Sequence, residues 1–135
     1  MTSIGSVKMK QISAEDCITQ ILKDIDKRKT VNYADKNSVR RYNAAMDRII
    51  VKANYLCDNY PDKMNLFISL LDHPDYDICS TCTAVLYGLH NVTRDQQLAA
   101  LASAKHLLSH PDINELETFL LTVNIERWET ELHTI

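Results

Sequence analysis

The chain contains the same turn twice, and this repeat constrains its fold more than any other feature. Leu-Leu-x-His-Pro-Asp occurs at 70–75 and again at 107–112, so the two Pro residues are 37 positions apart. Each copy lies between two stretches of helical apolar periodicity, a pattern that predicts a helical hairpin. A period of this length is typical of two-helix solenoid repeats, which bury their apolar faces only by stacking.

We therefore expect an all-α chain of about six helices. A length of 135 residues is that of one domain, and two Gly and three Pro are too few for a sheet built on tight turns. The expected organisation has a flexible tail followed by a single domain at 12–135, whose parts are two capping helices, two helical-hairpin repeats and a C-terminal cap. The boundaries are 1–11 for the tail, 12–60 for the capping helices, 62–89 and 94–124 for the hairpins, and 125–135 for the cap.

Two long helices are expected before the repeats. Ser13 is a suitable N-cap for the first, which carries one apolar stripe at helical spacing. The second, from Asn37 to Tyr60, repeats apolar residues at alternating spacings of three and four. This seam consists of Val39, Tyr42, Met46, Ile49, Ala53, Leu56 and Tyr60. It fits packing against neighbouring helices, and it also leaves a homodimer open.

The helices of the two repeats have predicted inner faces. In the first hairpin the expected core residues are Met64, Phe67, Ile68 and Leu71, then, after an N-cap at Asp75, Ile78, Cys79, Cys82, Val85, Leu86 and Leu89. In the second hairpin Thr93 and Gln96 form a capping box, and Leu98, Leu101, Ala102 and Leu108 point inward. Asp112 is the expected N-cap of the last helix, whose predicted buried residues are Leu116, Phe119, Leu120 and Val123. Trp128 is expected to close the end of the core.

The sequence contains no pattern that predicts catalysis. Cys79 and Cys82 form a C-x-x-C, but Cys79 lies a full turn inside its helix, whereas redox cysteines begin one. Core packing is therefore the favoured interpretation, with a metal or redox role as the alternative. His73 and His110 occupy matching places in the repeat, where His suits a helix end better than a metal or acid–base pair. We expect no enzyme activity, no cofactor and no metal.

Charge is unevenly distributed along the chain. Residues 1–60 hold 11 basic and 7 acidic side chains, whereas residues 112–135 hold 1 and 6. The acidic C-terminal part favours a basic partner protein over nucleic acid. The sequence has no secretory leader and no apolar run long enough to cross a membrane, so we expect a cytoplasmic protein with no membrane partner.

The expected binding surface is the concave side of the stack, where the second helices of neighbouring repeats meet. The candidate partner-binding residues are Asp75, Tyr76, Asp77, Thr81, Tyr87, Asn114, Glu117, Leu121 and Asn124. They combine acids, amides and a hydroxyl with two Tyr rings, which are favoured in binding hot spots. An ordinary solvated helix surface is the alternative.

At its two turns the chain resembles HEAT-like repeat proteins. The shape LL-x-HPD followed by an apolar position, with Ala84 and Leu86 further along, is similar to the hairpin of that family. The resemblance covers about residues 37–128 and is nearest to a group of small bacterial HEAT-like proteins, some of which are thought to be immunity proteins. It implies an α–α superhelix and a protein that binds and occludes a cognate toxin, such as a basic nuclease domain. A scaffold or regulatory adaptor without a toxin partner is the alternative function.

Overall fold

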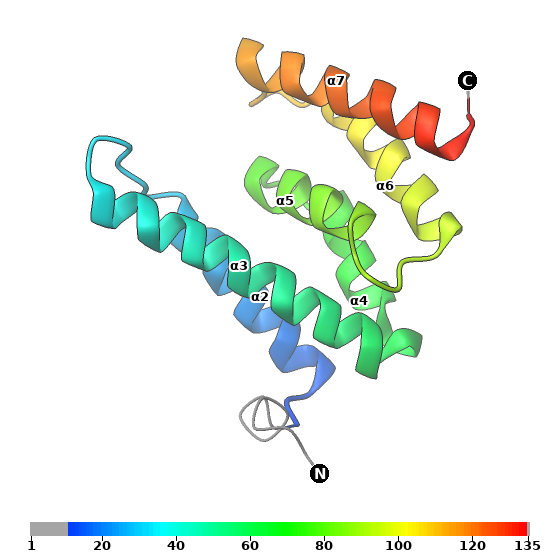
Figure 1. The fold of residues 1–135 in the computed structure, drawn as a ribbon, viewed down its shortest axis with the longest axis horizontal. Helices are drawn as coiled ribbons and strands as arrows, with labels where there is room; N and C mark the ends of the chain where they lie inside the picture. Colours follow the sequence, from blue (N-terminus) through cyan, green and yellow to red (C-terminus); the bar gives the residue numbers. More distant parts are fainter. Residues whose placement is uncertain (1–10, 135) are drawn as a thin grey trace.

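The computed structural model describes residues 11–134, which are helical apart from the connecting turns (Figure 1). The tail expected at 1–11 lies outside the described residues except for Gln11. The elements in chain order are α2 (Ala14–Arg28), α3 (Lys36–Asn59), the 3-10 helix η1 (Pro61–Lys63), α4 (Asn65–Ile68), the 3-10 helix η2 (Ser69–Asp72), α5 (Tyr76–Tyr87), α6 (Arg94–Leu107) and α7 (Glu115–Leu132). The described part therefore has six α-helices and no strand, which confirms the all-α class. Within it, no helix has the length and apolar character needed to cross a membrane.

α2 and α3 form an antiparallel pair (Figure 1). Ser13 caps α2 as expected, because its Oγ accepts a hydrogen bond of 3.0 Å from the backbone N–H of Asp16. The α3 seam packs inside the chain: Ile49, Ala53 and Leu56 are fully buried in the common core. The periodicity of this helix is thus explained by intramolecular packing.

A buried carboxylate also joins α2 to α3. Asp24 lies on α2 and is only 3% exposed. Its Oδ1 is 2.9 Å from a guanidinium nitrogen of Arg48, and its Oδ2 is 3.5 Å from Nζ of Lys52, both on α3. Lys27 approaches the same carboxylate at 3.8 Å. Since a buried charge without partners is costly, these cations are what allow Asp24 to lie in the helix interface.

The first helix of the first hairpin is less regular than expected. Residues 61–72 form one four-residue α-helix between two 3-10 segments, because i→i+3 hydrogen bonds replace the α-helical pattern at both ends. The predicted inner face is nevertheless correct, since Phe67 is fully buried and Met64 and Leu71 are nearly so. α5 follows in the centre of the fold, where it contacts α2, α3 and α6. Its predicted core residues are buried, apart from Ile78, which is half-buried against the core.

α6 begins with the expected capping box of Thr93 and Gln96. Part of its predicted inner face is wrong: Ala102 and Leu108 are exposed. The helix buries Ala100, Leu101, Ala104 and Leu107 instead. Four alanines in this helix give its pattern little contrast, so the packing against α5 decides which side faces the core.

α7 differs most from the expectation. Its N-cap is Asn114, not Asp112: Oδ1 of Asn114 accepts from the N–H of Glu117 at 2.8 Å, and Oε1 of Glu117 accepts from the N–H of Asn114 at 3.1 Å. The helix also continues without a break through 125–132, where a separate cap was expected. The four residues predicted to be buried are 46–65% exposed, namely Leu116, Phe119, Leu120 and Val123.

The reason is that α7 carries two apolar faces. The other face includes Ile125, Trp128 and Leu132, which are all buried, so Trp128 does close the end of the core as expected. Burying Trp128 rotates the helix so that the longer run of aliphatic residues points away from the core. The sequence pattern alone could not rank the two faces.

Candidate functional site

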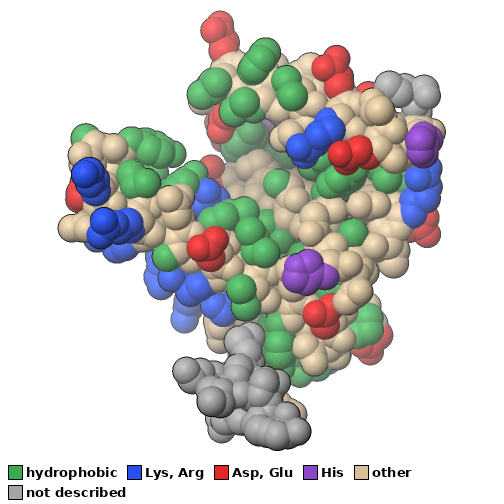
Figure 2. Space-filling view, viewed as in Figure 1, with side chains coloured by type: hydrophobic (Ala, Val, Ile, Leu, Met, Phe, Trp, Pro, Cys, Tyr) green, Lys and Arg blue, Asp and Glu red, His purple; other side chains and the backbone are tan. Residues whose placement is uncertain are grey.

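A groove lies between the α2–α3 connection and the first half of α7, with the first half of α5 as its floor. The space-filling view is hollowed between these two parts of the surface (Figure 2). Three hollows of about 240, 260 and 200 Å³ make up the groove, and Glu117 lines all of them. Because they share this side chain, the three hollows adjoin one another, and we call them together the groove.

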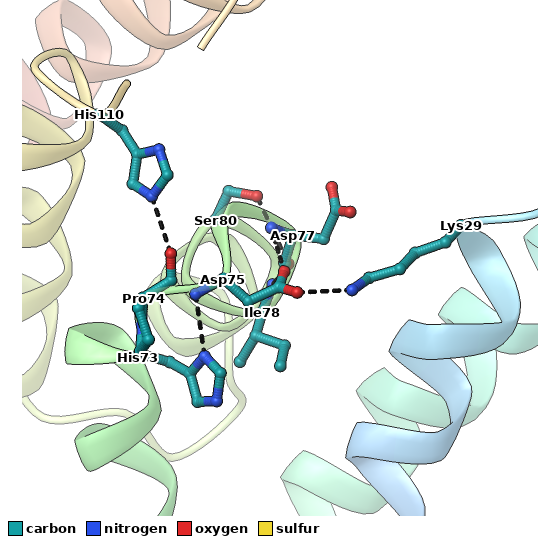
Figure 3. Close-up of polar contacts among 8 residues, drawn as sticks. All are labelled: Lys29, His73, Pro74, Asp75, Asp77, Ile78, Ser80 and His110. Atoms are coloured by element: carbon teal, nitrogen blue, oxygen red, sulfur yellow. Dashed lines mark hydrogen bonds and ion pairs between the residues drawn. The ribbon is translucent and has the colours of Figure 1, made fainter. Parts of the chain in front are cut away.

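Asp75 builds the floor of the groove by starting α5. Its Oδ1 accepts hydrogen bonds from the N–H groups of Asp77 at 2.9 Å and Ile78 at 3.2 Å, as an N-cap requires (Figure 3). Its Oδ2 lies 2.6 Å from Nζ of Lys29, at the end of α2. The hydrogen bond from Lys29 is the main reason that the pKa of Asp75 is lowered, and it correspondingly raises the pKa of Lys29. This contact ties one wall of the groove to its floor.

The two repeated turns contact each other through His110. Nε2 of His110 donates to the carbonyl oxygen of Pro74 at 3.0 Å, while its Nδ1 accepts from the N–H of Asp112 at 3.1 Å (Figure 3). His73 makes the matching local bond, with Nδ1 accepting from the N–H of Asp75 at 3.0 Å. The repeated shape of the turn thus has a structural cause, since each His ring closes its own turn. The two rings do not converge on a common point.

Carboxylates dominate the part of the groove near α7. Asp77, Asp112 and Glu117 line it, and none of the three forms an ion pair within residues 11–134. Burial raises the pKa of Tyr76 to about 12, with further contributions from Glu117 and Asp77. The phenol therefore remains protonated at neutral pH and can donate a hydrogen bond. A surface of this composition favours cationic groups of a partner.

Two Tyr rings form the opposite wall. Tyr33 and Tyr42 pack edge to face with centroids 5.9 Å apart, and the guanidinium of Arg28 lies 4.0 Å above the Tyr42 ring. Tyr33 is 72% exposed, which is unusual for an aromatic side chain held by a neighbour. Rings of this kind supply contact area at a small entropic cost, because they have few rotatable bonds.

The structure brings most of the predicted partner-binding residues together. Six of them line the groove along with Asp75, namely Tyr76, Asp77, Thr81, Glu117, Leu121 and Asn124. Two have other roles: Asn114 is the N-cap of α7, and Tyr87 stacks on Trp128 with centroids 4.1 Å apart. The hydroxyl of Tyr87 also donates to Glu131 at 2.6 Å, and burial with this bond raises its pKa to about 12.

Sequence reasoning missed the wall formed by the α2–α3 connection. Its members are Arg28, Lys29, Val31, Tyr33 and Tyr42. Tyr42 was assigned to the inner seam of its helix, and it does lie at the edge of that seam. The sequence contains no signal for the meeting of residues 28–42 with residues 77–117, because tertiary packing alone brings them together.

The cysteines have the environment of core residues. Cys17, Cys57, Cys79 and Cys82 are all free and buried. Burial raises the pKa of the Cys82 thiol to about 12 and also raises that of Cys79, whose Sγ donates to the carbonyl oxygen of Leu71. Both groups are therefore thiols at neutral pH, whereas a reactive cysteine needs thiolate. Within residues 11–134 no group of three or more potential ligands could hold a metal ion.

Comparison of this chain with protein-family models, with curated proteins and with solved structures found no match.

Replacing Asp75 with Ala should lower the free energy of unfolding by about 1–2 kcal/mol, since α5 loses its N-cap. Asp75→Asn should cost less, because its amide oxygen can still accept from Asp77 and Ile78. The pKa of Asp75 is lowered in the folded state, so its contribution is complete above about pH 4 and is lost as the pH falls through the folded pKa. Urea unfolding at about pH 7 and about pH 3 should therefore show that the difference in stability between wild type and Asp75→Asn is smaller at the lower pH. A constant difference would mean that Lys29 contributes nothing through this carboxylate.

Proposed function

We propose that this chain is a protein-binding module that holds a basic partner protein in the groove. The observation that supports the proposal is the meeting of three hollows at Glu117, which gives the groove carboxylates on one side and Tyr rings on the other. Carboxylates steer a basic partner toward the surface and fix its orientation, and Tyr rings provide anchoring contacts. The two types of side chain therefore have complementary roles in one site.

The architecture proposed for this function is a short HEAT-like stack. One hairpin runs from η1 to α5 and the other from α6 to α7, and α5 packs against α6. In such a stack the second helices of neighbouring repeats line a common concave surface. Here the second helices are α5 and α7, and both supply side chains to the groove.

The most concrete form of the proposal is an immunity protein that occludes a cognate bacterial toxin. The resemblance of the repeated turns to small bacterial HEAT-like proteins supports this form, and so does the acidic balance of residues 112–135. Inhibition would need no catalytic step from this chain, because the chain would cover the surface of the toxin that is bound in the groove. A scaffold or regulatory adaptor would use the same groove for a partner that is not toxic.

The test begins with a partner that copurifies with the wild-type chain. Its affinity for the wild-type chain is then compared with its affinity for variants. Asp77→Asn/Asp112→Asn removes two charges from the groove without changing side-chain size, and we call it the groove variant. We expect it to weaken binding about tenfold or more and to reduce the salt dependence of the association rate. Titration calorimetry and stopped-flow association give both quantities.

A matched control is Asp62→Asn/Asp95→Asn. Both residues are exposed, both lie at the start of a helix as Asp77 does, and neither lines the groove. This control should leave the affinity within about twofold. Equal losses in the two variants would mean that net charge, rather than the groove, attracts the partner. An unchanged affinity in the groove variant would place the binding site elsewhere.

The immunity and adaptor forms differ in one further experiment. Expression of the partner alone in a bacterial host should stop growth if it is a toxin, and co-expression of the wild-type chain should restore growth. The groove variant should restore growth less well at the same expression level. Normal growth with the partner alone would favour the adaptor.

A further inference from the structure

α7 exposes an apolar stripe on the side that faces away from the core. Leu116, Phe119, Leu120 and Val123 are 65%, 65%, 51% and 46% exposed, respectively. Their spacing places all four on one face of the helix. Hydrophobic side chains gather over the first half of α7 in the space-filling view (Figure 2). We call these four residues the α7 stripe.

The stripe is not explained by the fold. The opposite face of α7 provides the buried contacts to the rest of the chain, and no element among residues 11–134 covers the stripe. Four large apolar side chains with exposed fractions of 46–65% present an area on the order of a few hundred Å², the size of patch that marks an interaction site. Scattered single apolar residues would need no such account.

The charges around the stripe determine what can cover it. Helical spacing places Glu115 and Glu126 along one side of the stripe, and Glu117 along the other. The only cation on α7 is Arg127, which lies beyond the C-terminal end of the stripe and is 4.0 Å from the carboxylate of Glu131. A second copy of α7 would bring the same acidic rims together, and like charges at an interface are costly. The rim instead complements cations on both flanks of an apolar face.

We propose that the α7 stripe docks a basic amphipathic helix of the partner protein. This inference rests on the proposed function and adds a second contact surface to it, with a defined class of segment. Apolar residues at helical spacing on that segment would cover the stripe, and Lys or Arg on its two flanks would face the glutamates of the rim. Leu120 belongs to the stripe and also lines the groove, so one partner can occupy both surfaces.

The probe is a synthetic amphipathic peptide of about 18 residues with Leu on one helical face and Lys on both flanks. Fluorescence anisotropy should detect its binding to the wild-type chain. Leu116→Ser/Phe119→Ser, the stripe variant, should weaken binding at least about tenfold, because it removes the two most exposed anchors. Ile50→Ser/Val51→Ser is the matched control, since it removes two exposed apolar residues from α3, and it should stay within about twofold.

Two altered peptides separate the contributions of the apolar face and of the charges. A peptide with Ser in place of Leu keeps the charges, and one with Glu in place of Lys keeps the apolar face. Neither should bind detectably if the stripe and its acidic rim act together. Strong binding of the Ser peptide would overturn the proposal, because charge alone would then account for the affinity.

Other outcomes would also overturn it. Loss of peptide binding in the groove variant but not in the stripe variant would place the helix in the groove and leave the proposed function intact. Dimerisation of the wild-type chain that the stripe variant abolishes in sedimentation equilibrium would make a second copy the occupant. Binding to anionic lipid vesicles that the stripe variant abolishes would make a membrane surface the occupant of the stripe. Absence of peptide binding would remove the inference without affecting the separate measurement on the purified partner.

Discussion

Replacing Trp128 with Ala is expected to lower the free energy of unfolding by about 3–5 kcal/mol. Trp128 is 3% exposed and stacks on Tyr87 with an angle of 8° between the ring planes. It is the largest of the three buried residues that hold α7, the others being Ile125 and Leu132. The substitution therefore opens a large cavity and removes the main contact between α7 and α5. Urea unfolding followed by far-UV circular dichroism is the measurement, because the variant lacks the chain's single Trp.

Trp128→Phe provides the matched control. It keeps an aromatic ring against Tyr87, and it removes an indole N–H that is buried and donates no hydrogen bond within residues 11–134. The smaller ring fills less space, which lowers stability, whereas losing the unpaired N–H raises it. We therefore expect the free energy of unfolding to fall by less than about 1.5 kcal/mol. A loss below about 1.5 kcal/mol in Trp128→Ala itself would contradict the central role of this side chain in holding α7.

The local features of the fold could be predicted from the sequence. Ser13, Asp75 and the box of Thr93 and Gln96 cap their helices as expected, because capping depends on residues two or three positions apart. The repeated turn was recognisable for the same reason. The contact between the two turns was not recognisable, since the bond from His110 to Pro74 joins segments that are distant in the chain.

The orientation of α7 could not be predicted in this way. The helix has one face with four aliphatic or aromatic residues and another built around Trp128, and periodicity gives both a similar weight. The structure buries the second face and leaves Leu116 and Phe119 each 65% exposed. A face that looks like core and lies in solvent is informative about function, because stability alone does not account for it.

Half of the candidate site followed from the repeat. Shifting the outward positions of α5 by one repeat length selected Glu117, Leu121 and Asn124, and these residues line hollows of the groove, as Asp77 and Thr81 do. The other half lies on the α2–α3 connection, which is outside the repeat. The angle at which α2 and α3 pack on α5 determines that wall, and no short-range pattern encodes such an angle.

The ion cluster at the α2–α3 interface gives the second large effect. Replacing both Arg48 and Lys52 with Met should lower the free energy of unfolding by about 3–5 kcal/mol at neutral pH. The apolar stems keep their packing, but Asp24, 3% exposed, would retain a buried charge with only Lys27 nearby at 3.8 Å. Adding Asp24→Asn to this variant should recover about 1–3 kcal/mol, because a neutral amide costs less to bury than an unpaired carboxylate.

This recovery distinguishes the effect of the ion pairs to Asp24 from a general requirement for positive charge on α3. Arg40→Met/Arg41→Met removes two exposed cations from the same helix, and we expect it to change the free energy of unfolding by less than about 0.5 kcal/mol. Asp24→Asn in the otherwise wild-type chain should destabilise it, whereas the same change in the Arg48→Met/Lys52→Met background should stabilise it. This reversal of sign is the strongest form of the prediction, since a side chain that acts only through packing would cost about the same in both backgrounds. Equal effects of Asp24→Asn in the two backgrounds would mean that the carboxylate is stabilised by solvent or by the backbone rather than by the two cations of α3.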